Sequence, residues 1–389
     1  MHSRRALLIL VLAFLAAFIP VAPAANRPAH RSFIMYVGTY TGPHSKGIYA
    51  LRFDPASGKS TSLGVMAETT NPSFLAVDRA GKHLYAANEV PDYNGGKSGS
   101  VSAFAIDRKT GKLTFLNEVA SRGADPCHLS LDHTGKYLLV ANYTGGSVAS
   151  FPILADGRLG EPSSVVQHTG HGPNAERQEA PHAHEIQLTP DNRFAIAADL
   201  GLDELLVYRF DPAKGSLTPN DPPFAKVDPG AGPRHFVFHP NHKFVFALNE
   251  MGGSVTSFAF DARAGALRKL QTVSSLPERF KGKNDSAEIV SDASGKFLYA
   301  SNRGPDNIAV FAVDSAKGSL HLVEHVSTKG KAPRNFAIDS SGKYLFAANQ
   351  ESNNIVVFRV DPKTGRLTDT GQVLDLPSPV CIVFLPAGE

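Results

Sequence analysis

The chain has 389 residues, of which 42% are hydrophobic and 19% charged, with a formal net charge of +3 at pH 7. This near balance excludes the electrostatics of a nucleic-acid-binding protein, and two cysteines exclude a disulfide framework and a four-cysteine zinc site. The 34 glycines and 27 prolines are typical of many short strands joined by turns, and the composition excludes disordered, fibrous, coiled-coil and polytopic membrane proteins.

Residues 1–25 have the pattern of a secretory signal peptide. Arg4 and Arg5 precede an uninterrupted apolar run over residues 6–19, and an Ala-Pro-Ala sequence ends at Ala24. The run is shorter than the roughly 20 residues that a membrane span needs, although an uncleaved anchor is the alternative interpretation. We therefore predict cleavage near Ala24 and a periplasmic or secreted protein. Loss of the two arginines lowers the net charge from +3 to +1.

From residue 33 onward, one unit recurs along the chain. It consists of an apolar strand, an Asp-x-x-Gly-Lys turn, a second apolar strand that ends in Asn or a substitute, a third strand and a second turn. The second strands end at Thr39, Asn88, Asn142, Asp199, Asn249, Asn302 and Asn349. Apolar residues alternate with small or polar ones in the third strands, as expected for strands that are buried on one or both faces.

Four short antiparallel strands in about 50 residues are the sequence signature of a propeller blade. Seven copies predict an all-β fold, a single seven-bladed β-propeller over residues 33–387. Residues 34–68 supply a second, third and fourth strand without a first, and residues 381–385 form a first strand without the others. We therefore expect the C-terminal strand to join the N-terminal blade and close the ring. A solenoid of stacked β-repeats is the alternative, but it would not need these complementary ends.

The units differ at positions that a propeller brings to one rim. The first strand of each blade starts at the end where the antiparallel second strand stops. We interpret the recurring Asn there as structural, capping a turn through its own backbone. The variable positions beside it include His128, His184, Glu185, Arg234, His235, Glu250, Glu288, Arg303 and Arg334. Opposed charges in a concave mouth are costly to desolvate, so we predict a functional site there, the alternative being a solvated rim with ordinary ion pairs.

The segment leading into the fourth unit, HTGHGPNAERQEAPHAH, contains four histidines in residues 168–184. A metal site is one interpretation, because His182 and His184 share a strand face and imidazole is a common ligand. No cysteine or Asp-rich cluster adjoins them, so we expect neither a metal ion nor another cofactor. The histidines would then be acid–base groups or part of a polar lid.

The repeated G-K-x-L-x-x-A-N, the opening Y-V-G-T-Y and the sequences PHAHEI, GPRHFVFHP, FALNE and YASNRG resemble the seven-bladed propeller lactonases. These include propeller-type bacterial 6-phosphogluconolactonase and the fungal carboxy-cis,cis-muconate cyclases, and the resemblance extends from about Phe33 to Pro386. It implies a lactone hydrolase whose catalytic site is formed by His184, Arg234, Glu250 and Arg303. As substrate-binding residues we add His128, His182, His235 and Arg334, and we favour Arg303 over Arg334 as the second catalytic arginine.

Lactone hydrolysis needs a base to activate water, donors for the oxyanion and anchors for the substrate. Either His184 or Glu250 is a candidate base, since a glutamate buried beside apolar strands can have a raised pKa. Arg234 and Arg303 would hold a phosphate or carboxylate, or stabilise the oxyanion. The reaction requires no nucleophile, and no G-x-S-x-G elbow is present.

Two other functions remain open: a non-catalytic propeller that binds a ligand or protein on this rim, and a muconate cycloisomerase-like enzyme. The export signal favours an unphosphorylated sugar-acid lactone over a cytosolic sugar phosphate. We expect a monomer that binds neither nucleic acid nor, after signal removal, a membrane. Cys127 and Cys381 belong to separated blades, beyond the ~7 Å Cα separation of a disulfide, so both should be free and buried.

Overall fold

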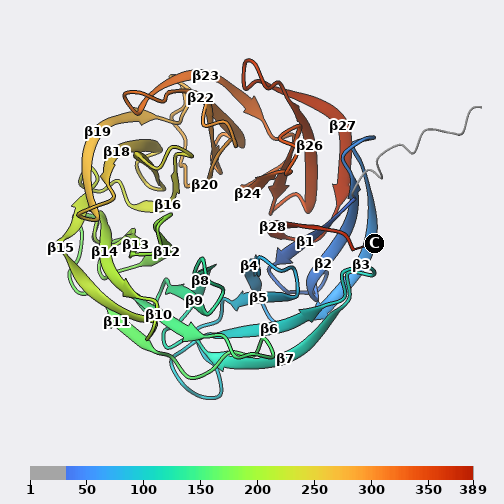
Figure 1. Ribbon diagram of the computed structural model, residues 1–389. Helices are drawn as coiled ribbons and strands as arrows, with labels where there is room; N and C mark the ends of the chain where they lie inside the picture. The colour runs from blue at the N-terminus through green and yellow to red at the C-terminus, as the bar shows by residue number, and fades with distance from the viewer. Residues whose placement is uncertain (1–31, 389) are drawn as a thin grey trace, which may run out of the picture. The chain divides into compact units, whose positions relative to one another are not determined.

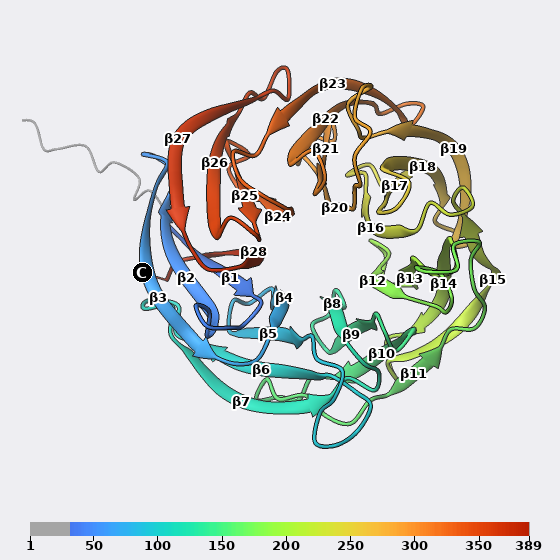
Figure 2. The ribbon, with the colours of Figure 1, turned by 180° about the vertical axis from the view of Figure 1, so that it is seen from behind.

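The computed structural model describes residues 32–388, which form 28 β-strands in seven antiparallel four-stranded sheets. The sheets are arranged as blades around a common axis (Figures 1 and 2). The seven-bladed propeller predicted from the repeats is therefore confirmed. These residues contain no α-helix, and hence none that could cross a membrane. The predicted signal peptide, residues 1–25, lies outside the described residues.

The strands of each blade are given from the innermost to the outermost. Blade 1 consists of β28 (Pro379–Pro386), β1 (Phe33–Thr39), β2 (Gly47–Asp54) and β3 (Lys59–Glu68), and blade 2 of β4 (Pro72–Val77), β5 (His83–Asn88), β6 (Ser100–Ile106) and β7 (Leu113–Ala120). Blade 3 consists of β8 (Pro126–Leu131), β9 (Tyr137–Asn142), β10 (Ser147–Pro152) and β11 (Ser164–Gln167), and blade 4 of β12 (Ala183–Leu188), β13 (Phe194–Asp199), β14 (Glu204–Asp211) and β15 (Ser216–Lys226).

Blade 5 consists of β16 (Pro233–Phe238), β17 (Phe244–Asn249), β18 (Ser254–Asp261) and β19 (Ala266–Ser274). Blade 6 consists of β20 (Ser286–Ser291), β21 (Phe297–Asn302), β22 (Asn307–Asp314) and β23 (Ser319–Ser327), and blade 7 of β24 (Pro333–Ile338), β25 (Tyr344–Asn349), β26 (Asn354–Val360) and β27 (Leu367–Asp375).

Blade 1 is built from both ends of the propeller sequence. Strand β28 pairs antiparallel with β1, in a register that runs from Phe33 opposite Pro386 to Thr39 opposite Pro379. The red C-terminal strand therefore lies beside the blue N-terminal strands in Figure 1. This pairing closes the ring as the two incomplete end units predict, and the solenoid alternative is wrong.

The hydrophobic core lies between the blades. Seven clusters of buried side chains fill the seven blade–blade interfaces. At the junction of blades 7 and 1, the ring of Phe53 meets those of Phe346 and Tyr344 edge-on, with centroids 5.0 and 5.5 Å apart. Because both faces of each blade are covered, the second strands are apolar along nearly their whole length.

Two recurring motifs of the sequence stabilise each blade locally. In the Asp-x-x-Gly-Lys turn of blade 3, Asp132 Oδ1 accepts the backbone N–H groups of Lys136 and Tyr137 at 2.7 and 2.8 Å. The recurring Asn also has a structural role, but not mainly as a cap of its own turn. The side-chain amide of Asn142 donates to the carbonyl of Ser121 in the preceding loop, at 3.1 Å. The Asn therefore ties the second strand to the chain that enters the blade.

Candidate active site

A bulge in the innermost strand of each blade redirects side chains at one end of the propeller. In β16, Pro233 pairs with Asn249 and His235 pairs with Leu248, which leaves Arg234 without a partner across the sheet. A bulge interrupts the alternation of side-chain directions and is frequent beside active sites. The same irregularity occurs in all seven innermost strands and involves Ser73, Cys127, His184, Arg234, Ala287, Arg334 and Val380.

Some of these bulge residues, together with residues that follow the recurring Asn, enclose a pocket of about 230 Å³. Its lining consists of Glu89, Cys127, Tyr143, Arg177, His184, Glu250, Asp285, Arg303 and Arg334. Drug-sized ligands occupy roughly 300–1,000 Å³, so this volume suits a smaller molecule such as a monosaccharide. Four of the predicted site residues are thus brought together, and Arg234 contacts Glu250 from behind the lining.

Glu250 is the charged centre of this pocket, and only 6% of its side chain is exposed. Its Oε2 lies 2.9 Å from Arg234 Nε and 2.8 Å from Arg303 Nη2, and its Oε1 accepts a hydrogen bond of 2.6 Å from Arg177 Nη2. Burial acts to raise the pKa of Glu250, but the three guanidinium groups outweigh it and lower the pKa to about 2. The raised pKa expected from the sequence is therefore wrong, and Glu250 is a weak base.

His184 is the other candidate base, and it lines the pocket with 4% of its surface exposed. The rings of His235 and Tyr143 stand edge-on to it, at centroid distances of 5.2 and 5.4 Å. Burial and the charge of Arg234 hold the pKa of His184 well below its usual range. The imidazole is therefore neutral at physiological pH and able to accept a proton. Burial also raises the pKa of Cys127, whose Sγ lies 3.6 Å from His184 Nδ1.

The two candidate second arginines differ in how their donors are used. Arg303 donates from Nε to the carbonyl of Asp285 at 2.8 Å and from Nη2 to Glu250. The guanidinium of Arg334 instead lies over the ring of Tyr40, 5.2 Å from its centroid, and 3.9 Å from Glu89. Within residues 32–388 no hydrogen bond uses the Arg334 guanidinium, so its donors are available to a ligand.

Four rim residues predicted from the sequence lie outside the pocket lining, namely His128, Glu185, His235 and Glu288. Their side chains bridge neighbouring innermost strands near the bulges. Glu185 Oε2 accepts the backbone N–H of Phe236 in the next blade at 2.5 Å, and His128 Nδ1 accepts that of Ile186 at 3.4 Å. The structure therefore places His128 and His235 behind the site that they were expected to line.

His182 also lies outside the lining and supports a residue that belongs to it. Its ring stacks on that of Tyr143, with centroids 4.6 Å apart and an interplanar angle of 17°. Its Nδ1 lies 3.2 Å from the carbonyl oxygen of Tyr143. Tyr143 is thereby fixed against the pocket, so the contribution of His182 is indirect.

Arg177 lines the pocket but is not among the site residues predicted from the sequence. It reaches the pocket from the histidine-containing loop, donating to Glu250 and, from Nη1, to Asp285 Oδ1 at 3.2 Å. A further contact of 3.4 Å joins Nη2 to the hydroxyl of Tyr143. A loop has no periodicity from which a side-chain direction can be read. The nearest signal is the histidine-containing segment itself, for which the sequence leaves a polar lid as one alternative.

The protonation of Glu288 gives a testable pH dependence of stability. Burial raises its pKa from 4.5 to about 7. Between these two values the folded state holds a proton that the unfolded state releases, so this group's contribution to stability falls as the pH rises. We expect Glu288→Gln, which cannot titrate, to lessen the loss of Tm between about pH 5 and pH 8.

Thermal unfolding of both proteins, followed by circular dichroism across that range, measures this difference. Glu161→Gln is the matched control, because the Glu161 side chain is 84% exposed and its replacement should leave the pH slope unchanged. An unaltered slope in Glu288→Gln would show that Glu288 is not the titrating group.

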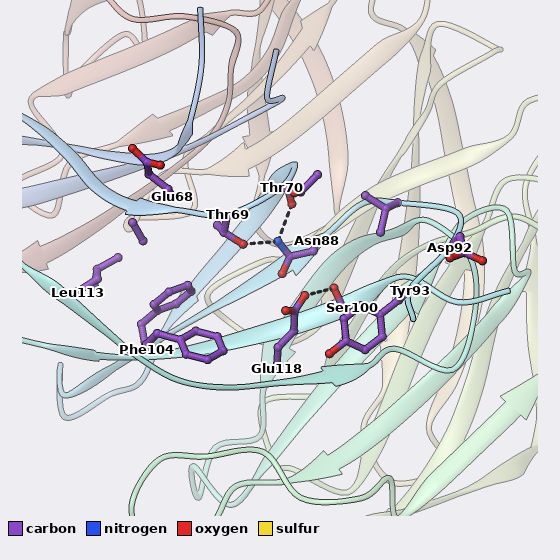
Figure 3. Close-up of a pocket in the computed structure, with 13 residues that line it drawn as sticks. Glu68, Thr69, Thr70, Asn88, Asp92, Tyr93, Ser100, Phe104, Leu113 and Glu118 are labelled. Carbon is purple, nitrogen blue, oxygen red and sulfur yellow. Dashed lines mark hydrogen bonds between the residues drawn. The ribbon is translucent and has the colours of Figure 1, made fainter. Parts of the chain in front are cut away.

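A larger groove, of about 580 Å³, lies between β3 and the pair β6 and β7 (Figure 3). Glu118 accepts a hydrogen bond from Ser100 there, and Asn88 donates to Thr69 and to the carbonyl of Thr70. Its lining contains no histidine, arginine or lysine. The groove therefore lacks both a base near neutrality and an anchor for an anion, and the smaller pocket is the candidate active site.

Two further expectations concern cysteines and metals. Cys127 and Cys381 are both free and buried, as predicted. Among residues 32–388, no group of three or more His, Cys, Asp or Glu side chains is arranged to hold a metal ion.

Comparison with known proteins identifies relatives that share most or all of the propeller. The family model "Lactonase, 7-bladed beta-propeller" matches residues 34–384. The chain is 40% identical over 353 residues to a 6-phosphogluconolactonase of Bacillus subtilis, covering 91% of this chain and 98% of the relative. It is 36% identical over 308 residues to a 6-phosphogluconolactonase of Formosa agariphila, covering 78% and 86%. The solved structure of the Pseudomonas aeruginosa periplasmic gluconolactonase PpgL is 36% identical, with a TM-score of 0.87, covering 92% of this chain and all of that one.

Proposed function

This chain belongs to the seven-bladed β-propeller lactonase family, and we propose that it hydrolyses a sugar-acid lactone in the pocket around Glu250. One observation carries the proposal: a neutral imidazole and a guanidinium with unused donors line the same buried pocket. A base and a set of cationic donors are the two things that water attack on an ester carbonyl requires.

His184 acts as the base in this mechanism. It takes a proton from water as the water oxygen attacks the lactone carbonyl carbon, which gives a tetrahedral oxyanion and an imidazolium. The ring C–O bond then breaks, and the imidazolium returns its proton to the leaving alkoxide oxygen. A lowered pKa makes His184 a weaker base but a stronger acid in the second step. No protein nucleophile takes part.

The arginines stabilise the charge that develops on the carbonyl oxygen. Among residues 32–388 the guanidinium of Arg334 makes no hydrogen bond, and its contact with Glu89 is 3.9 Å long. Arg303 lines the same pocket. Charge-assisted hydrogen bonds from such groups are stronger than neutral ones, and they need no reorganisation when they are held in place. Glu250, ionised because its pKa is about 2, holds Arg303 and Arg234 in position rather than taking the proton.

We also propose that the protein is exported. The pattern of residues 1–25 supports this, as does the similarity to a protein described as a periplasmic gluconolactonase. An exported enzyme meets unphosphorylated sugar-acid lactones more readily than sugar phosphates, so the first substrate to test is an unphosphorylated aldonolactone. The monomeric state stays a prediction.

A panel of lactones tests the proposed activity. Purified mature protein is expected to open glucono-1,5-lactone faster than the spontaneous rate, measured by titration at constant pH, because both the base and the oxyanion donors are in place. The panel includes the 6-phosphate of the same lactone and a muconolactone, which together separate the substrate classes. Hydrolysis of none of them, with retained binding of an aldonate, would favour a non-catalytic binding propeller, and turnover of the muconolactone alone would favour a cycloisomerase.

A further inference from the structure

In blade 4 the recurring Asn is replaced, and the contact with the chain that enters the blade is made in a different way. In blades 3, 6 and 7 the Asn side-chain amide donates to a backbone carbonyl, from Asn142 to Ser121, from Asn302 to Ser275 and from Asn349 to Thr328. Each acceptor is the first residue after the outermost strand of the preceding blade. In blade 4 the corresponding residues are Asp199 and His168, so both partners of the contact have changed.

Asp199 contacts a different set of partners from those of the recurring Asn. Its Oδ2 lies 2.6 Å from His168 Nδ1, and neither side chain has any exposed surface. The other ring nitrogen of His168 lies 2.8 Å from the hydroxyl of Tyr208. Oδ1 of Asp199 accepts the backbone N–H of His182 at 2.8 Å. Residues 168 and 182 are the first and last of the loop between β11 and β12, so one carboxylate holds both of its ends.

This loop, residues 168–182, is the longest of the seven blade-to-blade connections in the described chain. A longer loop loses more entropy when its ends are fixed, and a charged hydrogen bond is about twice as strong as a neutral one. Its middle is fixed as well, because the fully buried Gln178 donates from Nε2 to the carbonyl of Leu200 and to Asp203 Oδ1, both at 2.8 Å. The residue beside Gln178 is Arg177.

Arg177 lies where the pocket meets solvent. Its side chain is 34% exposed, against 15% for Arg303, 17% for Arg334 and 3% for Arg234. Three of these arginines line the pocket together with the carboxylates of Glu89, Glu250 and Asp285, and Arg234 adds a fourth guanidinium behind the lining. Arg177, the most exposed of the four, is therefore the arginine that an incoming ligand meets first.

We propose that Arg177 is a specificity-determining residue that contacts an anionic group of the substrate, and that His168 and Asp199 are the positioning residues that deliver it. This inference rests on the proposed lactone hydrolysis and predicts that, among the lactones opened, those with a carboxylate or phosphate facing the pocket mouth are preferred. His168 and Asp199 are completely buried, so they act through the loop and not on the substrate.

The test compares Arg177→Ala, Asp199→Asn and the double variant with the wild type. Asp199→Asn inserts the residue that five other units carry at this position. The substrates are neutral glucono-1,5-lactone, its 6-phosphate and a glucarolactone, so phosphate and carboxylate are separate arms. In Arg177→Ala, the ratio of kcat/KM for a charged lactone to that for the neutral one should fall about tenfold to a hundredfold, as expected for one lost charge-assisted contact.

Asp199→Asn should lower the same ratio about threefold to tenfold, through KM rather than kcat. The double variant should have the same ratio as Arg177→Ala, because Asp199 acts only through Arg177. Arg177→Lys should restore part of the ratio. Tyr208→Phe and its control Tyr299→Phe form a matched pair. Tyr208→Phe removes the hydroxyl that contacts His168. Tyr299→Phe removes a buried hydroxyl that donates to the carbonyl of Gly365 at 2.9 Å, outside the pocket lining. Only Tyr208→Phe should change the ratio.

Equal losses on charged and neutral lactones, or additive losses in the double variant, would overturn the inference by showing that Asp199 is merely structural. If the wild type opens no lactone, the proposed function fails, and calorimetric binding of 6-phosphogluconate decides the inference separately. Affinity lowered in Arg177→Ala and Asp199→Asn would support it, and unchanged affinity would overturn it.

Discussion

Replacement of His184 with Asn is expected to lower kcat for lactone opening by about two to four orders of magnitude, the usual contribution of a general base. Near neutral pH the imidazole of His184 is unprotonated, because burial and Arg234 lower its pKa. It is therefore the group of the pocket lining that can take a proton from the attacking water. KM should change little, because the side chain acts on the attacking water rather than on the sugar. Steady-state rates measured by titration at constant pH provide the comparison.

His171→Asn is the matched control, since His171 lies in the loop that precedes β12, is exposed and is absent from the pocket lining. The pH profile gives an independent check. Protonation of His184 abolishes its basicity, and its pKa lies well below the usual 6.5, so kcat/KM should persist below pH 6.5 and fall only at more acidic pH. A variant with undiminished kcat would assign the proton transfer to another group.

Replacement of Glu250 with Gln is expected to destabilise the folded protein by about 3–5 kcal/mol, the cost of removing one partner from a buried ionic cluster. The carboxylate contacts Arg177, Arg234 and Arg303, and without it three cations repel one another with little solvent to screen them. Activity should fall with stability, because the arginines lose the group that orients them. Unfolding in urea measures the free energy directly.

Glu89→Gln is the control for this second variant. Glu89 lines the same pocket, but its ion pair with Arg334 is long, 3.9 Å, so its loss should cost far less stability. Equal unfolding free energies for Glu250→Gln and the wild type would mean that the ionic cluster contributes little to the stability of the folded protein.

The fold could be predicted from the sequence because the same strand and turn pattern recurs in every blade. Asn142, Asn302 and Asn349 mark equivalent strand ends, and the two incomplete end units predict the pairing of β1 with β28. The same register places His184, Glu250, Arg303 and Arg334 at one rim, because strand ends that recur in phase must meet around the axis.

What could not be predicted depends on contacts between blades. The bulge leaves Arg234 without a partner across the sheet while His235 pairs with Leu248, and regular strand geometry does not predict this irregularity. The pKa of Glu250 depends on charges from three separate segments, one of them a loop, so a general rule for buried glutamates gave the wrong sign. Arg177 lies in that loop, where no periodicity indicates a direction.

The most direct test of the account is the initial rate of glucono-1,5-lactone opening by the wild type and by His184→Asn, measured side by side near pH 6.5 against the spontaneous reaction. The account predicts a clear excess over the spontaneous rate for the wild type and nearly none for the variant. Equal excess rates for the two proteins would contradict the assignment of the proton transfer to His184, and no excess for the wild type on any lactone of the panel would contradict lactone hydrolysis itself.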